Sequence, residues 1–367
     1  MTPQVAFLLL GETLLVPHLF PIVEALAAKS PTLPIDLWVS NAGMEDLVRP
    51  WTEALPSVRV RRAPGFRRDA RPAAKLPTLA RLLPRLARTP VVVCAEQTSL
   101  WIPRVLPWLP ARFVKTSHGV GSLSARDDPR RMAAHRTLVP SEQERRTYLE
   151  RGMPPERIVA TGYVKAGFRQ RTASRTLFER PRSTLLYAPH WQAHRSSWPA
   201  WGREIVDRLA AQDEWNVILA PHQRLVERFP EVRAVLREVA HLPHVHCDLD
   251  SFALVDGSYT AAADIYLGDT SSQVLEFLVD PRPTIFLDPR ARDWGADPDY
   301  AMWRAGEVVV ALSELLPSIR RAPDLHPTYV EAQRDIAFAA LGDTSGAAPA
   351  RAAEEVLGVL ATSRAGG

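Results

Sequence analysis

The chain contains little cysteine and almost no lysine. Its two cysteines among 367 residues, Cys94 and Cys247, form neither a metal-ligating pattern nor a disulfide framework, so the sequence predicts a protein of a reducing compartment. Lysine occurs at four positions only, and the basic charge is therefore carried by arginine, which favours bidentate contacts with phosphate and carboxylate. The alternative explanation for most of these arginines is a GC-rich genome. The formal charge of +4 is modest, and we expect no nucleic-acid partner.

Long apolar runs are also missing. No stretch approaches the roughly 20 apolar residues that a membrane-spanning helix needs, and the opening MTPQVAFLLLGETLL lacks the basic segment of a signal peptide. We therefore expect a cytoplasmic protein, for which a peripheral contact with the inner face of the membrane stays open.

The sequence does contain a regular alternation of short apolar runs with amphipathic segments, which is typical of parallel βαβ units. In the first half we expect helices at Leu19–Lys29 and Pro77–Arg88, and another that begins at Ser141 with Glu144 in the capping-box position. The strands expected there are Val5–Leu10, Ile35–Ser40, Val91–Cys94, Phe113–Thr116, Thr137–Pro140 and Ile158–Ala160.

The second half repeats the alternation. The strands expected there are Leu185–Ala188, Val217–Ala220, Val245–Cys247, Asp264–Leu267 and Thr284–Leu287. The helices expected there are Trp201–Gln212, Pro230–Ala240, Ser271–Leu278 and Ala347–Thr362.

This length and pattern predict an α/β protein with two Rossmann-like domains that face a cleft. We expect the domains at residues 1–170 and 183–345, joined by an arginine-rich linker at 169–182 and followed by a C-terminal helix and tail at 346–367. In open parallel sheets, ligands lie beyond the carboxyl ends of the strands. The informative residues should therefore come directly after the predicted strands.

One such place is the turn at 268–272, which lies between a buried strand and a helix. A helix N-terminus offers free backbone N–H groups to phosphate, and the turn adds hydroxyl groups. Glu276 lies one turn further on, where it could accept hydrogen bonds from a ribose. The alternative is that Ser271 only caps the helix. The nucleotide-binding candidates of this segment are Asp269, Thr270, Ser271, Ser272 and Glu276.

Three histidines also follow predicted strands. His118, next to Gly119, could take a proton from a hydroxyl near neutral pH. His190 and His222 could donate hydrogen bonds to a diphosphate. For any one of them a satisfied loop histidine is the alternative, but three at strand ends favour a site.

Further candidates are less specific. Arg195 could grip phosphate or lie on the surface, Lys165 could touch substrate or form a salt bridge, and His18 could face the acceptor or be structural. A basic zone could dock an anionic acceptor or a membrane, or be a solvated face; it comprises Arg61, Arg62, Arg67, Arg68, Arg81, Arg85 and Arg88.

Taken together, these motifs resemble those of the CDP-glycerol glycerophosphotransferases, the teichoic-acid polymerase and primase type of enzyme. The resemblance covers roughly residues 115–290, and upstream of 115 it is architectural only. It is carried by Ser117-His118-Gly119, Gly162-Tyr163-Val164-Lys165, Tyr187-Ala188-Pro189-His190-Trp191, Leu219-Ala220-Pro221-His222, and Asp269-Thr270-Ser271-Ser272 with Glu276-Phe277.

The resemblance implies a GT-B fold and transfer of glycerol phosphate from CDP-glycerol to a hydroxyl of a glycan or polyol-phosphate, with no cofactor and no metal. His118 would match the general base of the family, His222 and the Ser271-Ser272 turn its diphosphate contacts, and Glu276 its ribose contact. Val164 and His190 depart from the family pattern, so the donor could be another nucleotide-activated compound.

Two other classes stay open. One is a nucleotide-sugar glycosyltransferase or UDP-sugar 2-epimerase of the same fold, although such epimerases have a Ser-Gly-Gly type of turn where this chain has Ser271-Ser272. The other is a non-catalytic nucleotide-binding protein.

Overall fold

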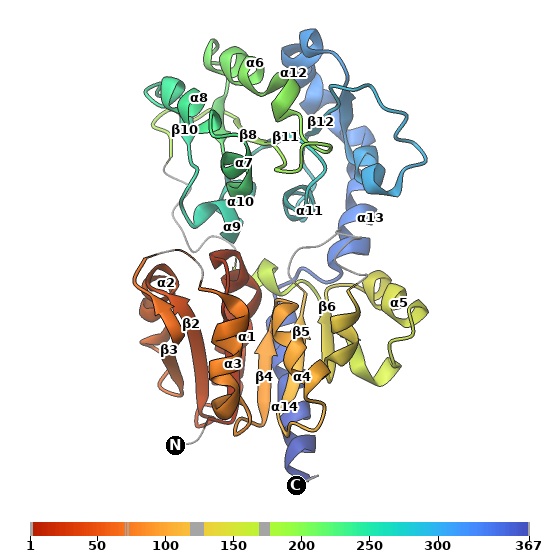
Figure 1. Cartoon of the computed structure of the whole chain (residues 1–367). Coiled ribbons are helices and arrows are strands. Elements are labelled where there is room, and N and C mark those ends of the chain that lie inside the picture. The colour runs from red at the N-terminus through yellow and green to blue at the C-terminus, as the bar shows by residue number, and fades with distance from the viewer. Residues whose placement is uncertain (1–2, 70, 72, 118–127, 169–176, 366–367) are drawn as a thin grey trace. The chain divides into compact units, whose positions relative to one another are not determined.

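The computed structural model describes residues 3–69, 71, 73–117, 128–168 and 177–365 (Figure 1). The chain divides into two compact units. The first comprises residues 1–168 and 339–367, and the second comprises residues 169–338. Each unit is an α/β domain built on one parallel sheet, as the alternation of the sequence predicts.

The sheet of the first unit has the strand order β3-β2-β1-β4-β5-β6-β7. Every pair in it is parallel. Its inner strands are buried on both faces, which is why they read as continuous apolar runs. The strands are β1 Val5–Leu9, β2 Ile35–Asn41, β3 Val58–Arg67, β4 Val91–Cys94, β5 Arg112–Thr116, β6 Arg136–Val139 and β7 Ile158–Ala160.

Helices cover this sheet. The predicted cap of α5 is confirmed, because Ser141 Oγ accepts a hydrogen bond from the backbone N–H of Glu144 at 3.2 Å. The carboxylate of Glu144 accepts a hydrogen bond from Ser117 Oγ at 3.1 Å. The helices of the first unit are α1 Val16–Lys29, α2 Ala42–Thr52, α3 Lys75–Leu86, α4 Trp101–Val105, α5 Glu142–Glu150 and α14 Ala348–Ala365.

Helix α14 comes from the end of the chain, yet it packs against α1, β4 and β5 of the first unit. Arg351 fixes its start by donating to the carbonyl oxygen of Thr161 at 2.7 Å. The turn before it depends on Gly342, which has a φ of +63°. The C-terminal segment is therefore part of the core of the first unit.

The second unit has the strand order β10-β9-β8-β11-β12-β13, again all parallel. Its strands are β8 Thr184–Ala188, β9 Asn216–Leu219, β10 Val245–Cys247, β11 Ile265–Gly268, β12 Thr284–Leu287 and β13 Glu307–Val309. Its helices are α6 Trp198–Ala210, α7 Gln223–Arg228, α8 Val232–Val239, α9 Ala253–Asp256, α10 Ser258–Ala262, α11 Ser272–Phe277, α12 Leu315–Leu325 and α13 Val330–Leu341, the last of which spans the boundary between the units.

Several elements are absent from the sequence-based prediction. The largest is the edge strand β3, whose exposed residues include Arg61, Arg62 and Arg67, so that its sequence is interpreted as part of a basic zone. The others are α2, α4, α7, α9, α10, α12, α13 and β13. Among the described residues, no helix is long and apolar enough to cross a membrane.

Candidate functional site

The strand order of the second unit reverses at β8, because β9 follows on one side of it and β11 lies on the other. Loops that leave the carboxyl ends of such neighbouring strands run apart and open a crevice, where open α/β sheets bind their ligands. The segments at this edge are 189–197 after β8, 220–222 after β9 and 269–271 after β11. They contain most of the site residues that the sequence predicts for this half.

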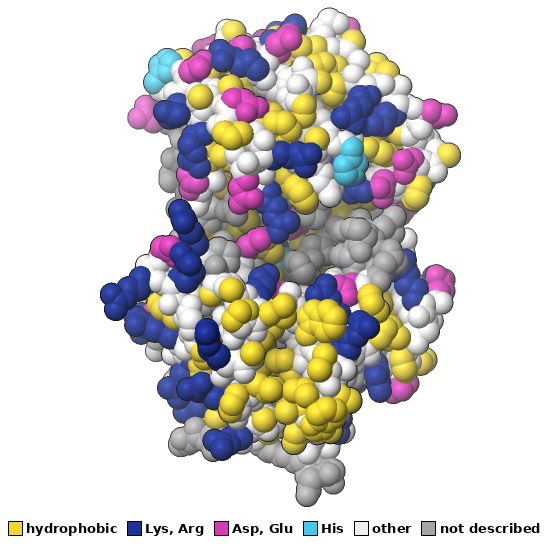
Figure 2. Space-filling view, viewed as in Figure 1, with side chains coloured by type: hydrophobic (Ala, Val, Ile, Leu, Met, Phe, Trp, Pro, Cys, Tyr) yellow, Lys and Arg dark blue, Asp and Glu magenta, His cyan; other side chains and the backbone are white. Residues whose placement is uncertain are grey.

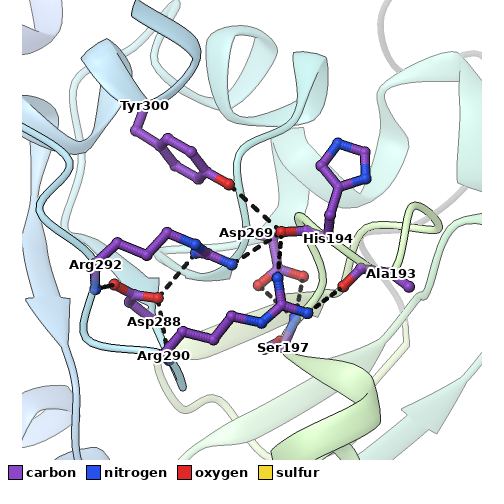
Figure 3. A network of polar contacts seen from close by, with 8 residues as sticks. All are labelled: Ala193, His194, Ser197, Asp269, Asp288, Arg290, Arg292 and Tyr300. Carbon is purple, nitrogen blue, oxygen red and sulfur yellow. Dashed lines mark hydrogen bonds and ion pairs between the residues drawn. The ribbon is translucent and has the colours of Figure 1, made fainter. Parts of the chain in front are cut away.

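Asp269 joins two of these segments. Its carboxylate is fully buried and accepts hydrogen bonds from the backbone N–H of His190 at 2.8 Å and of Ser197 at 3.0 Å. Figure 3 shows the contact with Ser197. Burial raises the pKa of Asp269 to about 7, against the opposing effect of these backbone donors. The turn after β11 thus holds both ends of the loop after β8.

Two arginines hold the middle of the same loop. Arg290 donates to the carbonyl oxygens of His194 at 2.8 Å and Ala193 at 3.0 Å, and Arg292 donates to that of His194 at 2.8 Å (Figure 3). Arg292 is itself fixed by the buried Asp288, whose Oδ1 lies 2.8 Å from its Nη1. The loop after β8 is therefore held in one conformation by charged groups from the segments after β11 and β12.

This fixed loop presents His190 beside His222, with their ring centroids 6.3 Å apart. The ring of Trp191 stacks on His190 at 5.8 Å, and the guanidinium of Arg224 lies 5.3 Å from the centroid of Trp191. The four side chains form one cluster at the carboxyl ends of β8 and β9, which we call the histidine cluster.

The tautomers of the two histidines follow from their hydrogen bonds. Nδ1 of His190 accepts from the backbone N–H of Gln192, and Nδ1 of His222 accepts from that of Arg224, both at 3.1 Å. An imidazole that accepts at Nδ1 carries its proton on Nε2. Burial lowers the pKa of His190 to about 3, so this ring is neutral near pH 7. Each of the two rings therefore carries its proton on Nε2.

The hydroxyl groups of the turn after β11 differ in their partners. Ser271 caps α11, because its Oγ accepts from the backbone N–H of Gln273 at 3.1 Å, and its own O–H remains a donor. Thr270 Oγ1 is buried without a hydrogen-bond partner among the described residues. Ser272, half-buried, is the first residue of α11. A buried hydroxyl without a partner is unusual and marks a place where a bound polar group would be favourable.

The side chain of Glu276 is more buried than expected for a residue that contacts a ribose. It is 8% exposed and lines a cavity of about 10 Å³ together with Tyr259, Thr260 and Gln273. That volume accommodates about one water molecule. The ribose role of Glu276 stays a prediction, and it requires this cavity to open.

Of the remaining candidates, Arg195 lies in the loop after β8 and pairs with Asp299. In the first unit, Lys165 is buried in the 3-10 helix Val164–Phe168, and His18 packs edge-on against Tyr163 with the centroids 6.0 Å apart. His18 and Ser117 line one small cavity at the carboxyl ends of β5 and β6. His118 and Gly119 fall outside the described residues, and their roles stay predictions.

Sequence reasoning missed the groups that build the loop after β8. Asp288, Arg290 and Arg292 follow β12, so the position rule applied to the other strands would have found them. Trp191 and Arg224 are neighbours of predicted histidines, but their mutual contact depends on two separate strands. Within the described residues, no group of three or more His, Cys, Asp or Glu side chains is arranged to hold a metal ion.

No family model matches the chain, and no curated protein matches it. Among solved structures, the wall teichoic acid polymerase TagF, in a variant soaked with CDPG, has a TM-score of 0.66 at 14% identity, covering 99% of this chain and 90% of that chain. A putative UDP-N-acetylglucosamine 2-epimerase from Listeria monocytogenes has a TM-score of 0.64 at 15% identity, covering 99% and 97%. The UDP-GlcNAc 2-epimerase from Methanocaldococcus jannaschii has a TM-score of 0.55 at 14% identity, covering 88% and 93%.

The resemblance found in the sequence motifs is thus confirmed at the level of the fold, since a teichoic acid polymerase stands among the structural neighbours. With two parallel sheets of seven and six strands, this chain has the GT-B fold that TagF and the 2-epimerases share.

Proposed function

We propose that the protein is a transferase that moves glycerol phosphate, or a similar group, from a CDP-activated donor to a hydroxyl of a cell-surface glycan or polyol-phosphate. The observation that carries this proposal is the pair of imidazoles in the second unit. His190 and His222 direct Nε2–H donors from the carboxyl ends of β8 and β9, beside the switch point of the sheet. Two fixed donors at this place suit the oxygens of a diphosphate.

The charge state of the histidine cluster suits a nucleotide that must be released after the reaction. A neutral His190 donates a hydrogen bond without holding the phosphate as a permanent ion pair. Thr270 and Ser271 would supply hydroxyl donors from the turn after β11. The Asp269 carboxylate faces backbone amides, which keeps its negative charge away from the diphosphate.

The reaction itself needs a base for the acceptor hydroxyl, and His118 is the residue proposed for it on the strength of its motif. In the transfer, the acceptor oxygen would form a new bond to the β-phosphorus of the donor while the bond from that phosphorus to the bridging oxygen of CMP breaks. The proton of the acceptor hydroxyl would pass to His118, and CMP would leave as an anion stabilised by the histidine cluster. No metal enters this scheme.

A second candidate function is supported by the comparisons. The 2-epimerase from Listeria monocytogenes is almost as similar in fold as TagF, with TM-scores of 0.64 and 0.66. A UDP-sugar enzyme would use the same crevice for a different base and a different reaction. The nucleotide therefore separates the two candidates.

A thermal-shift experiment with CDP, CMP, UDP and GDP tests the nucleotide. At a ligand concentration of 100 times Kd, binding adds about 2.7 kcal/mol, which raises the melting temperature of a unit of this size by roughly 5 to 10 °C. A preference for CDP supports the first candidate, and a preference for UDP supports the second. If no nucleotide shifts the melting temperature, both candidate functions are excluded.

Variants connect the binding to the cluster. We expect His222→Ala to weaken CDP binding about 10-fold or more, because it removes a donor to a charged group. His241→Ala, which changes an exposed histidine after α8, is the matched control and should bind as the wild type does. His118→Ala should abolish transfer and leave CDP binding nearly unchanged. Unchanged turnover in that variant would exclude His118 as the base.

A further inference from the structure

The first unit contains a basic pocket that the proposed reaction does not use. It has a volume of about 740 Å³, which lies within the range of about 300 to 1,000 Å³ typical of small-molecule sites. Four arginines and one carboxylate line it. We call it the arginine pocket, and its lining residues are Pro3, Asp36, Trp38, Arg61, Arg62, Arg85, Arg88 and Thr89.

The pocket lies on the sheet away from the edge expected to carry chemistry. Pro3 precedes β1, Thr89 precedes β4, and Asp36 is the second residue of β2, so these residues mark the amino ends of the strands. Ligands of the reaction are expected at the carboxyl ends. Figure 2 shows Lys and Arg side chains gathered over the part of the first unit where β2, β3 and α3 lie.

Two of the arginines already pair with buried acids. Asp36 is 3% exposed, and it binds Arg59 with its Oδ1 2.9 Å from Nε and lies 3.5 Å from Nε of Arg61. Arg62 pairs with the buried Glu45 at 2.8 Å. These pairs fix the β3 side of the pocket, and the carboxylates of Asp36 and Glu45 are already engaged in them.

The α3 side differs. Arg85 and Arg88 are exposed, and within the described part of the chain neither has a carboxylate at ion-pair distance. The guanidinium of Arg85 lies 5.8 Å from the ring centroid of Trp38, a residue of β2 that is 7% exposed. The pocket thus combines two uncompensated positive charges with an aromatic wall.

We propose that the arginine pocket binds a phosphate-bearing ligand. Guanidinium groups match the oxygens of a phosphate ester in bidentate geometry, and two of them at one site select a ligand with at least two negative oxygens. The wall formed by Trp38 and Pro3 would contact the apolar or planar part next to the phosphate. The ligand could be a free phosphate compound or the headgroup of an anionic lipid, and both share this chemistry.

The test compares two double variants that lose the same charge. Arg85→Gln with Arg88→Gln empties the pocket of its uncompensated charges, whereas Arg146→Gln with Arg151→Gln changes two exposed arginines at α5 of the same unit. Binding of inorganic pyrophosphate is measured by calorimetry. Binding to vesicles is measured by sedimentation, with phosphatidylglycerol in phosphatidylcholine against phosphatidylcholine alone. Melting curves check that both variants fold.

We expect the pocket variant to lose about 10-fold or more in affinity, and the control to stay within about twofold of the wild type. Pyrophosphate binding that is lost only in the pocket variant, without vesicle binding, identifies a soluble phosphate ligand. Charge-dependent vesicle binding that is lost only in the pocket variant identifies a lipid headgroup. Equal affinity of the two variants for both probes, or no binding of the wild type to either, overturns the proposal. Because the pocket lies in the first unit and the histidine cluster in the second, either outcome leaves the CDP experiment unaffected.

Discussion

Replacing Asp269 by asparagine tests how the loop after β8 is held. The carboxylate is 0% exposed, and its folded pKa of about 7 stands above the unfolded value of 3.8. An acid whose pKa is raised in the folded state contributes stability that is present at low pH and is lost as the pH rises through the folded pKa. Asparagine has nearly the same shape, never ionises, and therefore lacks this pH dependence.

The magnitude follows from the two pKa values of Asp269. Between pH 5 and pH 7 the folded wild type holds a proton that the unfolded chain has released, and each pH unit costs 1.36 kcal/mol. The free energy of unfolding of the wild type should therefore fall by about 3 kcal/mol between pH 5 and pH 8. That of Asp269→Asn should not show this decrease. At pH 5 the variant should be less stable by about 1 kcal/mol, because its amide turns one donor toward the N–H of Ser197.

Urea unfolding of both proteins at pH 5 and pH 8, followed by circular dichroism and by tryptophan fluorescence, measures this difference for the second unit. Asp213→Asn is the control, since the side chain of Asp213 is 71% exposed, and its pH dependence should match that of the wild type. Parallel pH curves for wild type and Asp269→Asn would refute the reasoning. They would mean that the amides of His190 and Ser197 fully offset the burial of the charge.

Two further predictions concern the first unit. Burial, followed by the charge of Arg131, lowers the pKa of Lys115 to about 7. Relative to Lys115→Met, the free energy of unfolding of the wild type should therefore rise by about 3 kcal/mol between pH 7 and pH 9, as urea unfolding would measure. Equal dependence of this free energy on pH in the two proteins would contradict the lowered pKa. Gly342→Ala should lower the free energy of unfolding by about 3 kcal/mol or more, because a Cβ there would overlap the carbonyl oxygen of Pro140. Gly346 has a φ of +89° and open space around it, so Gly346→Ala should cost only about 1 kcal/mol. Similar melting temperatures for the two variants would contradict this reasoning.

The strands of this protein were largely predictable, and the reason is local. β4, β10 and β12 begin and end at the predicted residues. For the inner strand β4 the reason is that a parallel strand covered on both faces must be apolar along its whole length. The edge strand β3 was not predictable in the same way. Arginine occupies most of its exposed positions, and the pairing of Asp36 in β2 with the half-buried Arg59 in β3 joins residues that are far apart in the sequence.

The candidate site was predictable in position but not in construction. His190, His222 and Asp269 follow strands, and the rule that ligands lie at strand ends singles them out. The bond from His190 to Asp269 joins residues 79 positions apart, and that from Arg290 to His194 joins residues 96 apart. No local pattern specifies such partners. Whether Asp269 also contacts a nucleotide stays a prediction, whereas its hold on the loop is a property of the fold.

The sequence by itself determined the class of the fold, the places where strands end and the cap at Ser141, because periodicity, burial and backbone chemistry act over a few neighbouring residues. Tertiary structure alone decided that the last helix, α14, belongs to the first unit, that two histidines share one cluster, and that Arg85 and Arg88 line one pocket without an ion-pair partner among the described residues. These outcomes depend on which distant segments a folded sheet brings together, and contacts of that range leave no trace in local composition.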